Sequence, residues 1–171
     1  MPLIDDDIIP LDRLTGAVCT ISYEHHEIHD GDRFVAQYFA TVASGGFCDL
    51  QITMPAGVYA HPTFMIYASA AADFGIYEAP TTSGGTAVTP LNRSRASSKT
   101  STATVVHSPT VSAVGTQLLY VPVSGSKLSA GVSDRDEWIL APGTKYIVRG
   151  ASLENGCRIA VIADWYQKAA P

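Results

Sequence analysis

The chain has 171 residues, a net charge of −5 at pH 7 and only 16% charged residues, and its length indicates one domain. The acidic balance argues against a general phosphate-binding surface, so no nucleic-acid partner is expected. No apolar stretch reaches the roughly 18 residues of a membrane span, and the N-terminal MPLIDDDIIP lacks the features of a secretory signal. No membrane partner is therefore expected.

Residues 1–16 are predicted to form an extended arm ahead of a single domain at 17–171. Two apolar pairs flank an acidic run in this arm, and Pro10 keeps it out of a helix interior. Such a segment cannot bury its apolar side chains alone, so we expect a partner chain to order it. An arm that packs on its own domain or stays disordered is the alternative. The candidate partner-binding residues of the arm are Leu3, Ile4, Asp5, Asp6, Asp7, Ile8 and Ile9.

Three histidines follow in the segment YEHHEIHDGDRF at 23–34. On a helix, His25 and His29 would share one face, as metal ligands do. The DGD at 30–32 predicts a turn, however, which argues against a continuous helix here. On a strand, His26 would face away from the other two. The same DGD does not begin an EF-hand calcium loop, so we predict no metal site and no cofactor.

Two segments alternate apolar and other residues with the period of a strand. In FCDLQITM (47–54) and CRIAVIADWY (157–166), every second side chain is apolar or a cysteine. Weaker strand signals lie at 33–43, 63–69, 74–78, 101–107, 117–123 and 144–151. The pattern predicts an all-β fold, an antiparallel two-sheet β-sandwich of jelly-roll type. Pro122 places its strand at an edge or bulge, and 144–152 is expected to pair with 157–166.

Residues 79–100 interrupt this pattern and are predicted to form a long polar loop. Loops of this length are uncommon and are usually functional or disordered. This loop holds three basic residues, Arg93, Arg95 and Lys99, in an acidic chain. Arg93 and Arg95 are therefore predicted to bind a partner, with the acidic run of the arm as one possible counter-charge.

No complete catalytic motif occurs along the chain. Asp134, Asp136 and Glu137 stand together, but carboxylates hydrolyse glycosides only at a suitable separation in space, and a solvated turn before a buried Trp138 is the expected structure. A nucleophile elbow, a P-loop and a dinucleotide-binding fingerprint are all missing from the sequence. The three cysteines are far apart and are predicted to be reduced thiols: Cys19, Cys48 and Cys157. The sequence therefore predicts no enzyme.

A series of segments spans about residues 20–167: HHEIHDGDRF, ASGGFCDLQITMP, the His61–Pro62 step into TFMIY, IYEAPTTSGGTAVTPLNRSR, HSPTVSAVGTQLL, EWILAPGTKYIVR and NGCRIAVIADWYQ. In their order and spacing, these segments resemble the small capsid decoration (head cement) proteins of tailed bacteriophages. The resemblance implies a β-sandwich without catalytic residues, made in the host cytoplasm and located on the capsid exterior of the virion. Its implied partners are the major capsid protein and further copies of the chain in a homotrimer.

Two other functions remain open, because one fold serves many functions. The first is a tail or fibre module that binds a receptor. The second is a carbohydrate-binding sandwich with an aromatic platform, for which the candidates are Tyr59, Tyr67, Tyr77, Tyr120 and Trp165. For the homotrimer, Ile162 and Tyr166 are expected to give the final strand an apolar outer face that a neighbour covers.

Overall fold

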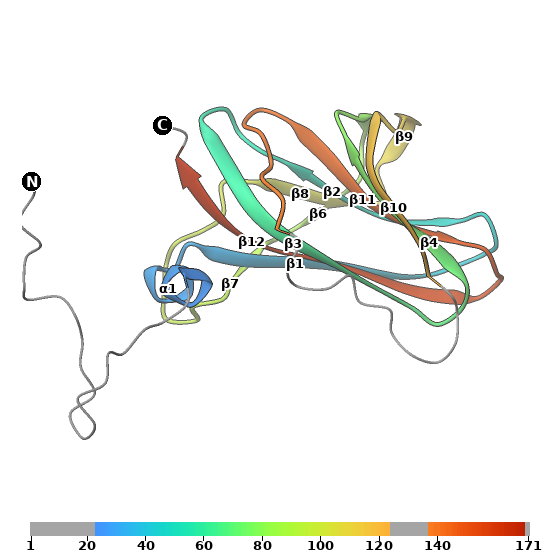
Figure 1. The fold of residues 1–171 in the computed structure, drawn as a ribbon, viewed down its shortest axis with the longest axis horizontal. Helices are drawn as coiled ribbons and strands as arrows, with labels where there is room; N and C mark the ends of the chain where they lie inside the picture. The colour runs from blue at the N-terminus through green and yellow to red at the C-terminus, as the bar shows by residue number, and fades with distance from the viewer. Residues whose placement is uncertain (1–22, 124–136, 170–171) are drawn as a thin grey trace, which may run out of the picture.

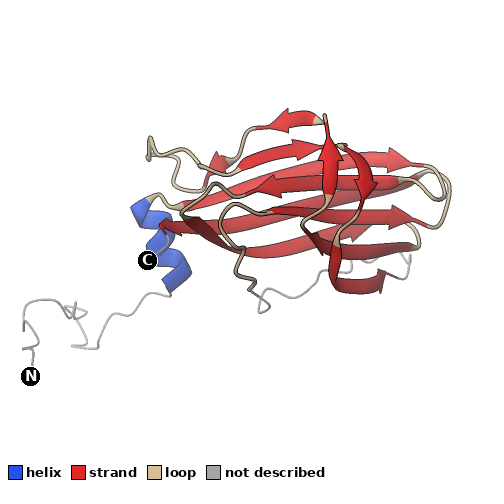
Figure 2. Ribbon diagram, turned by 90° about the horizontal axis from the view of Figure 1, so that it is seen from above, coloured by secondary structure: helices blue, strands red, loops and turns tan. Residues whose placement is uncertain are grey.

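Two antiparallel sheets packed face to face form the body of the protein (Figure 1, Figure 2). The computed structural model describes residues 23–123 and 137–169. The arm predicted at 1–16, with its contact residues from Leu3 to Ile9, lies outside the described residues, as do Cys19, Asp134 and Asp136. The described elements, in chain order, are α1 (Tyr23–Asp30), β1 (Arg33–Val42), β2 (Phe47–Thr53), β3 (Val58–Ala68), β4 (Ala72–Glu78), β5 (Thr81–Ser83), β6 (Thr86–Val88), β7 (Leu91–Asn92), β8 (Thr104–His107), β9 (Thr110–Ala113), β10 (Thr116–Val123), β11 (Lys145–Ser152) and β12 (Cys157–Ala169).

The strand order is that of a jelly roll. One sheet has the order β3-β12-β1-β7 and the other β10-β4-β11-β2-β8-β6. The chain alternates between the two sheets from β1 to β4, returns beside β4 as β10, and then places β11 and β12 inside opposite sheets. Residues 138–140 extend the free edge of β3, where the amide of Leu140 donates to the carbonyl of Ala60 at 2.8 Å. The all-β sandwich predicted from the sequence is confirmed.

The period-two alternation places the predicted side chains in the core between the sheets. Leu50 and Ile52 of β2 are at most 1% exposed, as are Ile159 and Trp165 of β12. Gly150 of β11 also faces this core, where a Cβ atom would lie only 2.6 Å from Ile159 Cγ2. Glycine therefore allows β11 to approach the opposite sheet at this point.

The expected pairing of the last two strands is wrong. β11 pairs with β2 and β4, whereas β12 pairs with β1 and β3 in the other sheet. The short turn between them crosses the sandwich, so that the apolar faces of both strands point into one core. Both strands do lie inside their sheets, and Pro122 lies on the edge strand β10, as its missing N–H requires.

Residues 79–100 form a loop only in part, because they contain the short strands β5, β6 and β7, whereas 93–100 have no helix or strand. They belong to a folded excursion between β4 and β10, the edge hairpin (residues 79–115), in which β5 pairs with β9 and β6 with β8. β8 extends the sheet beside β2, and β7 does so beside β1. These strands are only two to four residues long, too short for a periodicity to reveal. None of the described residues forms a helix long and apolar enough to cross a membrane.

Candidate functional site

The segment YEHHEIHD forms a helix, contrary to the sequence prediction. Gly31 follows α1 with φ +75°, and its amide donates to the carbonyl of Ile28 at 3.1 Å. The amide of Asp32 donates to the carbonyl of Glu27 at 2.9 Å. These two bonds form a Schellman motif, in which a glycine with positive φ closes the helix. The DGD sequence therefore terminates the helix after Asp30 and does not prevent it.

The three histidines of α1 form two separate side-chain pairs. His25 and His29 lie one helical turn apart with their Nε2 atoms 3.0 Å from each other and their rings stacked, the centroids 4.9 Å apart. On the neighbouring part of the helix, His26 Nδ1 lies 3.3 Å from Asp30 Oδ2. All four side chains are exposed, so the helix presents both pairs to solvent.

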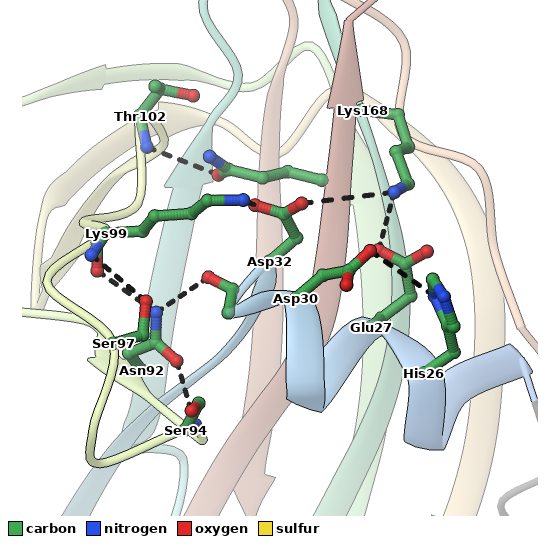
Figure 3. A network of polar contacts seen from close by, with 12 residues as sticks. His26, Glu27, Asp30, Asp32, Asn92, Ser94, Ser97, Lys99, Thr102 and Lys168 are labelled. Carbon is green, nitrogen blue, oxygen red and sulfur yellow. Dashed lines mark hydrogen bonds and ion pairs between the residues drawn. The ribbon is translucent and has the colours of Figure 1, made fainter.

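A polar network joins α1 to the edge hairpin and to the end of β12 (Figure 3). Glu27 is only 1% exposed, and its Oε2 lies 2.6 Å from Nζ of Lys168 on β12. Asp32, just after the helix, lies 2.9 Å from Nζ of Lys99 on the hairpin. Glu27 and Asp32 thus each face a lysine from a different element, and these contacts hold the short helix against the sandwich.

Asn92 is the central residue on the hairpin side of this network. Its Nδ2 donates to the carbonyls of Gly31 at 2.7 Å and Lys99 at 3.0 Å. Its Oδ1 accepts from the amide of Ser94 at 2.8 Å. A Cβ on Gly31 would lie 2.2 Å from Ser97 Oγ, so the hairpin approaches the end of the helix too closely for any side chain there.

The same network contains one group of potential metal ligands. One ligand atom each from His26, Glu27 and Asp30 lies within 4.8 Å of the other two. Lys168 already places an ammonium group against Glu27, at the position where a cation would be needed. A divalent metal would have to displace this lysine at the cost of Coulomb repulsion, so these three residues do not fit a metal site.

Arg93, predicted to bind a partner, is engaged within its own chain. Asp164 of β12 is 3% exposed and lies between two guanidinium groups. Its Oδ1 accepts from Arg33 Nε at 3.0 Å, and its Oδ2 accepts from Arg93 Nη2. Arg95 Nη1 donates to the carbonyl of Asn92 at 3.4 Å. Arg93 therefore joins the hairpin to β12, whereas the Arg95 bond lies within the hairpin itself.

An open groove of about 410 Å³ lies on the outer face of the four-stranded sheet. Phe39 of β1 and Tyr67 of β3 stand on either side of Ala160 of β12, in register across three strands. The guanidinium of Arg158 lies 5.5 Å from the centre of the Phe39 ring. The groove thus combines two aromatic walls, a small apolar floor and one cation.

Strands β1, β3 and β12, which line the groove, all reach the end of the sandwich opposite α1 (Figure 1). Three turns meet there, at 43–46, 69–71 and 153–156, and we call them the turn end. They are hydrogen-bonded to one another: the amide of Leu153 donates to the carbonyl of Ala71 at 2.9 Å, and the amide of Ser44 donates to Asn155 Oδ1 at 2.9 Å. These bonds cross-link the three turns.

Several other predicted residues have different environments from those expected. Trp165 belongs to the core and is not part of an aromatic platform. Tyr166, expected on an exposed apolar face, is 7% exposed and stacks on His61 with the ring centroids 4.6 Å apart. Glu137 of the predicted carboxylate group lies 3.6 Å from His61 Nδ1. Trp138, expected to be buried, is partly buried against the core.

Sequence reasoning missed Asn92, Asp164 and Lys168. Asp164 and Lys168 occupy outward-facing positions of β12, where a polar residue normally indicates contact with solvent. Asn92 lies in a strand of two residues, which carries no periodic signal. Comparison with known proteins adds no assignment, because no family model, curated protein or solved structure matches the chain.

Proposed function

We propose that this protein is a non-enzymatic structural protein of a tailed-bacteriophage virion, a capsid decoration protein that binds the outer face of the head shell. Its proposed partners are the major capsid protein and two further copies of itself. The sequence resemblance leads to this proposal, and the all-β sandwich is consistent with it. Two features of the described residues support it further: the pairing of the buried carboxylates and the exposure of large apolar side chains.

Within the described residues, every buried carboxylate is neutralised by a basic side chain of the same chain. Glu27 faces Lys168, Asp164 faces two arginines, and Asp49 accepts two hydrogen bonds of 2.7 Å from the guanidinium of Arg149. A buried charge that is fully paired in this way serves the fold. A general acid or base must instead stand within reach of a substrate, with its pKa suited to proton transfer.

The observation that carries the docking part of the proposal is the exposure of three large apolar side chains, one in the turn end and two on the strands beside it. Leu153 at its tip is 55% exposed, and Phe39 and Phe47 nearby are 55% and 52% exposed. Rigid surfaces that expose aromatic and aliphatic side chains lose little conformational entropy on binding, which favours protein–protein contacts. We therefore place the contact with the capsid at the turn end.

A co-sedimentation experiment with capsids assembled without this protein tests the proposal. The wild-type chain should bind the heads and raise the temperature at which they break open. Leu153→Ser should weaken binding at least about tenfold, since losing a central apolar contact costs more than about 1.4 kcal/mol. Leu91→Ser is the matched control, because Leu91 is equally exposed at 55% but lies on the edge hairpin. Binding to tails alone, or equal loss in both variants, would contradict the proposal.

The N-terminal arm is proposed as a second contact, made across a subunit boundary. Deletion of residues 2–10 should leave the sandwich folded but lower the affinity for heads. If the truncated protein assembles and binds heads as the full chain does, the arm is not an anchor and the turn end alone must suffice.

The groove between Phe39 and Tyr67 favours carbohydrate binding as a second candidate function. Aromatic rings that flank a small residue on an open sheet face can stack on sugar rings, and Arg158 adds hydrogen-bond donors. A screen of the purified chain against bacterial surface polysaccharides tests this. Binding that Tyr67→Ser abolishes, with no binding to heads, would favour a receptor-binding module of the tail.

A further inference from the structure

The exposed histidine pair of α1 has the geometry of a chelating site. The Nε2 atoms of His25 and His29 lie 3.0 Å apart across one helical turn. The turn predicted at DGD argued against a helix here and so against a metal site, but YEHHEIHD does form a helix. The Schellman motif at Gly31 and the contact of Glu27 with Lys168 hold the helix in place.

The separation of the two nitrogen atoms matches that of two ligands on one metal ion. Imidazole nitrogen binds divalent transition metals at about 2.0–2.1 Å, so two ligands at a right angle are about 2.9 Å apart and two at a tetrahedral angle about 3.4 Å. The observed 3.0 Å lies close to the right-angle value. The spacing of the two nitrogen atoms therefore matches two cis positions of a square-planar or octahedral ion.

We propose that His25 and His29 form a surface site for a divalent transition metal that favours right-angle coordination, Ni²⁺ or Cu²⁺, with water completing the shell. In the metal-free protein, one ring donates its Nε2 proton to the other ring. On binding, that ring takes the tautomer with its proton on Nδ1, so both Nε2 atoms bind the metal and neither ring loses its remaining proton.

The position of the site on the helix also favours a cation. His29 lies in the last turn of α1, where the partial negative charge of the helix C-terminus stabilises positive charge. Asp30, 45% exposed at its side chain, is the next residue in the chain. Hard cations such as Mg²⁺ prefer oxygen ligands and are not expected to bind this nitrogen pair. This inference does not depend on the proposed function.

Isothermal titration calorimetry with Ni²⁺ on the full chain, prepared without an oligohistidine tag, tests the site. We expect one binding event per chain that Mg²⁺ does not reproduce. His29→Gln should weaken it by more than about tenfold, because losing a ligand costs at least as much as losing an outer-shell partner. His26→Gln is the matched control, a neighbouring exposed histidine outside the pair, and should bind Ni²⁺ like the wild type.

A spectroscopic measurement distinguishes this pair from other histidines of the chain. With one equivalent of Cu²⁺, electron paramagnetic resonance should show coupling to two imidazole nitrogens in the wild type and in His26→Gln. The signal should change to a single nitrogen in His29→Gln. Absence of saturable Ni²⁺ binding, or a Cu²⁺ signal that His29→Gln leaves unchanged, would overturn the proposal.

Discussion

Replacing Asp164 by asparagine tests how the fold uses its buried charges. The carboxylate accepts from both Arg33 and Arg93, and an amide cannot replace both charged bonds. Hydrogen bonds to charged groups contribute about 1.5–3 kcal/mol each, so loss of both would cost about 3–6 kcal/mol. The two arginine side chains are 20% and 41% exposed, so water partly replaces the lost contacts. We therefore expect Asp164→Asn to lower the free energy of unfolding by about 2–4 kcal/mol.

Equilibrium unfolding in urea measures this change, and the slope with denaturant should stay constant if the native surface is unchanged. Arg33→Gln and Arg93→Gln are paired controls that each remove one contact. The Arg93 variant should be the milder of the two, because its side chain is more exposed. A loss below about 0.5 kcal/mol for Asp164→Asn, within the range of an ordinary surface substitution, would refute the reasoning.

Three further predictions concern the core, one thiol and the oligomer. Leu50→Ala and Ile159→Ala should each cost about 2–5 kcal/mol, and an unchanged denaturant midpoint in either would contradict the burial of these side chains. Burial raises the pKa of the Cys48 thiol from 9.0 to about 12. Stability should therefore fall as pH rises from 9 toward 12, because the unfolded thiol ionises first, and Cys48→Ala should reduce this fall. Sedimentation equilibrium should show a homotrimer, and a monomer both in solution and on isolated heads would exclude it.

The buried residues were predicted well where the alternation of apolar side chains within a single strand was sufficient. β2 and β12 each alternate over at least seven residues, and the faces assigned to Leu50 and Ile159 are buried. The opposite face of β2, with Asp49 and Gln51, is buried as well, which the alternation did not predict. Such a pattern depends only on the pleat of a single strand, so no knowledge of its neighbours is needed. The same property explains why the pairing of β11 with β12 was predicted wrongly: the alternation of β11 is compatible with pairing to β12 and with crossing to the opposite sheet.

The candidate site was harder to predict because its residues meet only in three dimensions. Asp164 pairs with Arg33, which is 131 positions away in the chain, and Glu27, near the start of the described residues, pairs with Lys168, near their end. The helix was missed because Gly31 was interpreted as part of a turn that precludes a helix, although a glycine at this point is also the usual helix terminator. A C-terminal glycine after an eight-residue segment was the signal available in the sequence.

The positions of the two surfaces lead to a last prediction, that metal binding and capsid binding are independent. The turn end and α1 lie at opposite ends of the sandwich, joined by β12 (Figure 1). From Arg158 near the turn end to Lys168 beside α1, ten steps along this strand at about 3.3 Å each span about 33 Å. Coupling over such a distance requires an element that has two conformations and whose equilibrium both sites shift. The strand β12 is hydrogen-bonded to β1 on one side and to β3 on the other, so it has no second conformation to adopt. Saturating Ni²⁺ should therefore change the affinity for heads by less than about twofold. A larger change that His29→Gln abolishes would mean that the helix end itself contacts the shell, and the docking surface would have to be reassigned from the turn end to α1.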